Sequence, residues 1–169
     1  MATYTGVTHQ PRTIITGRHD STQTNAISVD SIVLNFLCLI FPIGEFIPRG
    51  VGVNPLMYNL WIEDGQGSVS FASAPLFGIL FLETIVSVVT IFRYNNRRQQ
   101  IKFCSLNILL LVLWYITYAI VFSLNSIEDG GFKLHVVAVF PLISLIFTMM
   151  AKRGVKADEA LIRAADRIR

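Results

Sequence analysis

The sequence predicts an all-α integral membrane protein: an antiparallel four-helix bundle with a short periplasmic β-hairpin and a C-terminal amphipathic helix. The first observation behind this prediction is composition, because 53% of the 169 residues are hydrophobic and only 15% are charged. A soluble domain has about 25% charged residues, so this chain has too little polar surface to cover a core in water. The second observation is that the apolar residues form four long blocks. In a bilayer such blocks must be helical, because lipid offers the backbone no hydrogen bonds.

Three regions are predicted along the chain. Residues 1–30 are polar, with two Arg balanced by two Asp, and hold too few large apolar residues for a core. We therefore expect a disordered cytoplasmic tail there. Residues 31–152 are predicted to form the transmembrane domain, and residues 153–169 a cytoplasmic amphipathic helix. A secretory leader is disfavoured, because the polar lead is long and "FPIGEF" offers no small-x-small cleavage site.

The four apolar blocks approach the length of a membrane span, which is about 20 residues. The predicted spans cover about residues 29–47, 74–92, 103–124 and 134–151. The first is the least apolar, since it contains Asn35, Pro42 and Glu45. The second is interrupted by Glu83 alone, and the last two carry no charge, although Pro141 lies near the centre of the fourth.

Basic residues gather in two places, 93–102 with four and 152–169 with six of the fourteen Lys and Arg residues. The positive-inside rule places both regions in the cytoplasm, and with four spans it places both termini there. The residues assigned to orientation and to anionic lipid headgroups are Arg93, Arg97, Arg98, Lys102, Lys152 and Arg153. Each basic residue near such a surface gains about 1 kcal/mol. Nucleic acid is disfavoured as a partner, because the basic residues are not interleaved with aromatic residues suited to base stacking.

Two segments resemble a known family. "RYNNRRQQIKF" resembles the "Y-x-N-R-x-L-Q-x-K-L" segment between spans two and three of domain of unknown function 4293, a bacterial membrane family found mainly in Bacteroidota. The C-terminal "MAKRGVKADEALIRAADRIR" resembles the family's closing "A-x-K-A-I-K-K-D-E-x-L-V-R-S-x-D-R-L-R". The matching positions there are Lys156, Asp158, Glu159, Leu161, Arg163, Asp166, Arg167 and Arg169. The resemblance runs from about residue 31 to the end and implies four spans, the bacterial inner membrane and no established activity.

Glu83 is the most informative residue, because a carboxylate at the centre of a span costs about 2.5 to 3.5 kcal/mol on a translocon scale. One interpretation is a proton or cation site lined by the bundle. The other, which we favour, is a neutral carboxyl that donates a hydrogen bond between helices, since a transport path usually needs several intramembrane polar groups. The acceptor predicted for it is the carbonyl of Val137, because Pro141 has no N–H to occupy that oxygen. Thr117 and Tyr118 are further candidates.

Several residues are predicted at the outer membrane surface. Glu45 and His135 lie near the outer ends of their blocks. Either they form a pair whose charge follows external pH or, as we favour, they reach the headgroup region. The turn sequence "EDGQG" in loop 48–73 predicts the β-hairpin. Tyr58 and Trp61 in this loop suit the membrane–water boundary, and a periplasmic docking surface is the alternative.

The C-terminal segment from Lys156 onward is predicted to be a helix. Acidic residues lie in its first turn and arginines in its last, which complements the helix dipole. Glu159 and Arg163 form an i,i+4 pair in the favourable order. The segment is either a surface helix on the inner leaflet or a docking helix for a cytoplasmic protein.

These observations favour a non-catalytic accessory or assembly component of the inner membrane, acting through lipid and a protein partner or a second copy. A small transporter or proton-coupled channel subunit that uses Glu83 is the rival hypothesis. We expect no enzyme, cofactor or metal site, because no nucleophile–base pair or ligand set lies at one depth. Cys38 and Cys104 are predicted to be small buried hydrophobes.

Overall fold

The computed structural model describes residues 29–48, 52–64, 67–93, 97–125 and 131–166. Within these ranges, three helices are long and apolar enough to cross a membrane. They are α2 (Ala74–Phe92), α3 (Arg97–Asn125) and α4 (Phe140–Asp166). The fold is therefore mostly helical, as predicted, with helix α2 coinciding with the second apolar block.

The first apolar block forms a shorter helix than expected. Its helix, Val29–Ile40, is followed by strand β1 (Gly44–Ile47), so the prediction of one long helix over 29–47 is wrong. Pro42 explains the end of the helix, because proline disfavours helical geometry in the preceding residue and cannot donate a backbone hydrogen bond. A helix of this length rises about 18 Å, compared with a hydrocarbon core of about 30 Å.

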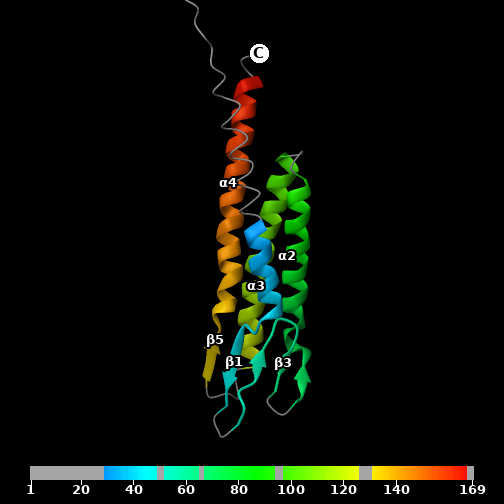
Figure 1. Cartoon of the computed structure of the whole chain (residues 1–169), viewed down its shortest axis with the longest axis vertical. Helices are drawn as coiled ribbons and strands as arrows, with labels where there is room; N and C mark the ends of the chain where they lie inside the picture. Colours follow the sequence, from blue (N-terminus) through cyan, green and yellow to red (C-terminus); the bar gives the residue numbers. More distant parts are fainter. Residues whose placement is uncertain (1–28, 49–51, 65–66, 94–96, 126–130, 167–169) are drawn as a thin grey trace, which may run out of the picture.

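A small antiparallel sheet lies at one end of the helices (Figure 1). Its strands in the described residues are β1, β2 (Leu56–Met57), β3 (Ile62–Glu63), β4 (Val69–Ser70) and β5 (Gly131–Leu134), in the order β4-β3-β2-β1-β5. The expected hairpin is present between β3 and β4, where the Asp64 N–H donates to the Ser68 carbonyl at 3.0 Å and Gly67 adopts a φ of 85°. The all-α prediction is thus incomplete, because β1 pairs with β5 from the far end of α3.

Buried and more exposed side chains alternate along β1, so the sheet has one face toward the core and one away from it. Gly44, Met57 and Ile62 are register partners and are buried against the helices. Phe46 packs on Phe132 of β5 with ring centroids 5.1 Å apart. Gly44 is required here, because a Cβ at this position would overlap the Phe132 ring.

Residues 140–166 form one continuous helix, α4. A short 3₁₀ helix, η2 (Val136–Val139), leads directly into α4, so Pro141 is the second residue of α4 rather than the centre of a span. Proline is favourable at this position, because the first helical N–H groups have no partner in any case. Residues 153–166 are helical, as expected, but they continue α4 without a break instead of forming a helix of their own.

The two ends of the bundle differ in character (Figure 1). The sheet end carries the five strands. The opposite end, called the basic end below, is where α2 ends, α3 begins and α4 extends past both, with Arg93, Lys102 and Lys152 in that region. The structure therefore brings the two basic regions of the sequence to the same end of the molecule.

Candidate functional site

The buried face of α2 changes from apolar to polar halfway along the helix. Leu76 and Leu80 are fully buried in the half near the sheet. Glu83, Ser87 and Thr90 continue the same face toward the basic end and are also buried. Spacings of three and four residues place all five on one side of the helix.

Helix α3 shows the same change and runs antiparallel to α2. Gln100, Cys104 and Asn107 are buried in its half near the basic end. Leu111 and Trp114 follow on the same face toward the sheet and are fully buried. The contact between α2 and α3 is therefore polar at the basic end and apolar at the sheet end.

Glu83 lies at the boundary between these halves and is the centre of a buried hydrogen-bonded chain. The Asn35 amide Nδ2 donates to Glu83 Oε2 at 2.5 Å, and Ser87 Oγ donates to Glu83 Oε1 at 2.9 Å. Asn107 Nδ2 in turn donates to Ser87 Oγ at 2.8 Å. We call Asn35, Glu83, Ser87 and Asn107 the polar chain. It joins the helix Val29–Ile40, α2 and α3 through groups that lipid cannot satisfy.

The partners predicted for Glu83 from the sequence are not the observed ones. The Val137 carbonyl accepts the Phe140 N–H at the start of α4. Thr117 Oγ1 donates to the Leu113 carbonyl of its own helix at 2.9 Å, and the Tyr118 ring stacks on Trp114. Sequence reasoning missed the polar chain. The signal that identifies it is the repeat of polar residues at helical spacing on α2 and α3.

Two oxygen atoms of the polar chain lack a hydrogen-bond partner within the described residues. They are Asn35 Oδ1 and Asn107 Oδ1, each on a buried side chain. Buried polar atoms in native proteins are almost always hydrogen-bonded to protein or to ordered water. Because both orphan atoms are acceptors next to polar neighbours, they suit water molecules that complete the chain.

Asn59 fastens the sheet-end loop to three helices. Its Nδ2 donates to the Cys38 carbonyl at 2.5 Å, and its Oδ1 accepts from Trp114 Nε1 at 3.0 Å. Its own carbonyl accepts the Phe77 N–H of α2 at 3.2 Å. The Cys38 carbonyl needs this partner, because the residue four positions later is Pro42, which has no N–H.

The structure brings the two predicted outer residues together. Glu45 of β1 and His135, just after β5, approach to 3.4 Å between Oε2 and Nε2. Lys133 Nζ lies 3.5 Å from Glu45 Oε1, and its side chain is 68% exposed. Trp61 is half-buried beside Tyr58 in the turn between β2 and β3. These contacts lie at the sheet surface, apart from the polar chain.

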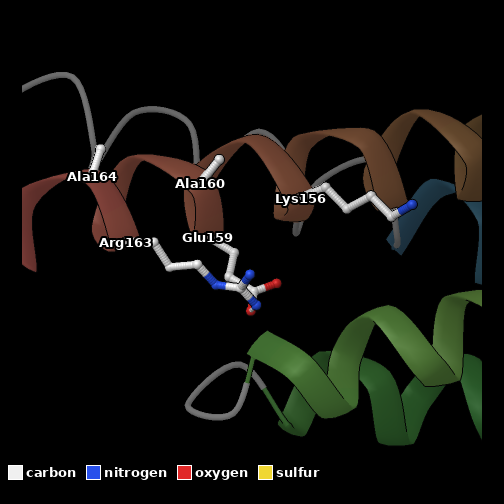
Figure 2. Close-up of a pocket in the computed structure, with 5 residues that line it drawn as sticks. All are labelled: Lys156, Glu159, Ala160, Arg163 and Ala164. Atoms are coloured by element: carbon white, nitrogen blue, oxygen red, sulfur yellow. Dashed lines mark hydrogen bonds and ion pairs between the residues drawn. The ribbon is translucent and has the colours of Figure 1, made fainter. Parts of the chain in front are cut away.

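The predicted tail residues lie on the second half of α4. Lys156, Glu159, Ala160, Arg163 and Ala164 line a shallow pocket of about 450 Å³. Figure 2 shows Glu159 and Arg163 side by side, pointing away from the two alanines. Arg163 Nη2 donates to Glu159 Oε1 at 2.5 Å, which is the predicted i,i+4 pair.

The remaining predicted tail and loop residues are only partly described. Leu161 is 67% exposed on α4. Arg97, Arg98, Asp158 and Asp166 belong to helices whose backbone is described without these side chains. Arg167 and Arg169 lie outside the described residues.

Within the described residues, no three His, Cys, Asp or Glu side chains are close enough together to hold a metal ion. Both Cys38 and Cys104 are buried free thiols.

Comparison with known proteins returns one family. The family model described as domain of unknown function DUF4293 matches residues 30–168, which is most of the chain. No curated protein matches.

Proposed function

We propose the function of this chain from the geometry of its structure. The chain belongs to the DUF4293 family, and the description of that family names no activity. The proposed role is a non-catalytic accessory or assembly component of the bacterial inner membrane. The protein would act through contacts of its α4 extension and its sheet with a partner protein, and through its basic end with anionic lipid.

The observation that carries this proposal is the continuity of α4. The helix that crosses the apolar layer extends past α2 and α3 without a break (Figure 1). Its extension bears Lys156, Glu159 and Arg163 around the pocket, and exposed Leu161 nearby. A rigid helix that projects from a membrane bundle presents its side chains at low entropic cost, which suits a docking element.

Four crossings with both termini in the cytoplasm are part of the proposal. The helix Val29–Ile40 runs with its N-terminal end toward the basic end (Figure 1), the direction expected of a first crossing, and its rise of about 18 Å covers part of the hydrocarbon layer. Reporter fusions between α2 and α3 and after Arg169 should both report a cytoplasmic location. A fusion between α3 and β5 should report the periplasm, and the reverse pattern would disprove the topology.

A pull-down tests the docking role. The full-length protein in mild detergent should retain a stoichiometric partner, and removal of residues 156–169 should release it. The control is Gln99→Ala at the start of α3, an exposed position outside both α4 and the sheet that should leave the partner bound. Retention of the same partner by the truncated protein would show that α4 is not the docking element.

A second candidate function is favoured by one observation, the polar chain around Glu83. Asn35 and Ser87 donate directly to a carboxyl that is completely buried, and Asn107 of α3 donates to Ser87. We therefore propose a small transporter or proton-coupled channel subunit as the alternative. Proteoliposomes should then pass protons, and Glu83→Ala should abolish the flux while Glu63→Ala, an exposed control on β3, should not.

A further inference from the structure

We propose that Glu83 is a reversible proton-binding site that exchanges its proton with the basic end of the bundle and not with the sheet end. This inference concerns the same site as the proton-coupled candidate function and rests on it, adding the ligand and the direction of access. It is independent of the docking role of α4.

Hydrogen bonding at Glu83 suits both the ionised and the protonated carboxyl. An ionised carboxyl accepts from Asn35 Nδ2 and Ser87 Oγ, as the structure has them. A protonated Oε2 must donate instead, and a half-turn of the Asn35 amide brings Oδ1 into place as the acceptor. Asn35 Oδ1 is unpartnered in the present orientation, so the turn breaks no hydrogen bond of that atom. An amide beside a carboxyl therefore serves both states with one side chain.

The Asn35 amide lies within hydrogen-bond distance of Glu83 Oε2, so either of its two polar atoms can meet the carboxyl after the half-turn. Ser87 is equally adaptable, since its hydroxyl donates to Glu83 and accepts from Asn107. The contacts of Asn35 and Ser87 with Glu83 therefore persist in both protonation states, with one atom of the Asn35 amide left without a protein partner in each.

Access from the basic end follows from the polar half of the contact between α2 and α3. From Glu83 toward that end, the buried side chains Ser87, Thr90, Asn107 and Gln100 offer hydroxyl and amide groups. Asn107 Oδ1 is an unpartnered acceptor along this route, suited to a water molecule next to Ser87. A hydronium ion entering by these groups gives its proton to the carboxylate and leaves as water, and nothing is oxidised or reduced.

Access from the sheet end is closed by apolar packing. Leu80, Leu111 and Trp114 continue the two buried faces beyond Glu83, and each is fully buried. The indole N–H of Trp114 is already bonded to Asn59. Two buried polar atoms on this side, Ser73 Oγ and the Tyr118 hydroxyl, lie beyond Leu80 and Trp114 along α2 and α3. The apolar residues between them and Glu83 are the barrier that favours access from the basic end.

The charged residues closest to Glu83 are several helical turns away or on other helices. Among the described residues no cation pairs with Glu83. The charged groups nearest to it along the helices that surround it are Asp30, Arg93, Lys102 and Lys152. Arg93 is ten residues beyond Glu83, or about 15 Å along α2. Protonation is thus controlled by the neutral polar chain rather than by an ion pair.

Dicyclohexylcarbodiimide tests proton binding, because this apolar reagent reacts with protonated carboxyls in apolar surroundings. The full-length protein in lipid nanodiscs should form an adduct at Glu83, located by peptide mass spectrometry, and the yield should fall as pH is raised. Glu83→Gln should lose the adduct, and Glu63, an exposed carboxyl, should remain unlabelled in the same sample. Absence of the adduct at every pH, or a yield independent of pH, would overturn the proposal.

Labelling at two pH values tests the direction of access. In oriented proteoliposomes, raising the pH on the side of the basic end alone should lower the yield of the Glu83 adduct, and raising it on the side of the sheet alone should leave the yield unchanged. The reverse dependence, or an equal response to both sides, would overturn one-sided access. Labelling of Glu83 that depends on pH, without proton flux, would remove the transport function and leave the proton site standing.

Discussion

Asn59→Leu is predicted to destabilise the protein strongly, because Asn59 holds two buried groups that have no other partner. One is the Cys38 carbonyl, freed by Pro42, and the other is the Trp114 indole N–H. Leu shares the branching of Asn at Cγ but is larger and has no polar atoms, so both hydrogen bonds are lost and overpacking adds to the cost. Each buried group left unpaired costs about 1–3 kcal/mol, which gives a combined loss of about 2–6 kcal/mol.

That loss is a large part of a typical unfolding free energy of about 5–15 kcal/mol. The assay is equilibrium unfolding in mixed micelles, followed by near-ultraviolet circular dichroism. Asn54→Leu is the matched control, since it makes the same exchange at an exposed position of the same loop and should be neutral. Equal stability of the two variants would refute the reasoning that Asn59 donates to the Cys38 carbonyl in place of the N–H that Pro42 lacks.

Three further predictions follow from particular contacts. Glu83→Gln should keep the fold, because an amide can both donate and accept, whereas Glu83→Leu leaves Asn35 and Ser87 unpaired and should cost about 2–6 kcal/mol in the same assay. Gly44→Ala should cost about 1–3 kcal/mol by overpacking against the Phe132 ring, measured by thermal unfolding; an unchanged melting temperature would contradict the close approach. Gly154→Pro should interrupt α4 at a cost of about 2 kcal/mol and release the docked partner, whereas a retained partner would show that helix continuity is not needed for docking.

The sheet is the part of the fold that could be predicted only partly from the sequence. The hairpin at Asp64 and Gly67 was predictable, because its turn residues are adjacent in the chain. Pairing of β1 with β5 was not, since it joins segments more than eighty residues apart and leaves no local pattern. From the sequence, Glu45 and Phe46 were therefore assigned to an apolar block. In the structure Phe46 packs on Phe132 and Glu45 pairs with His135.

Of the candidate site, the sequence predicted Glu83 but not the residues that bond to it. Glu83 is conspicuous as a lone carboxyl in an apolar helix. Its partners Asn35 and Asn107 come from other helices, and a hydrogen bond between helices depends on their rotation and depth. Pro141 was misplaced for a related reason, because an apolar block alone does not reveal where its helix begins.

Composition and block length by themselves determined that this chain forms long apolar helices, because a backbone in hydrocarbon has to satisfy its own hydrogen bonds. They also determined which end of the bundle is basic, since the charges lie between and after the blocks. Only the tertiary structure decided what Glu83 touches, how β1 finds β5 and why Asn59 matters. Each of these is a contact between groups far apart in the chain, and its energy depends on a distance that no local pattern encodes.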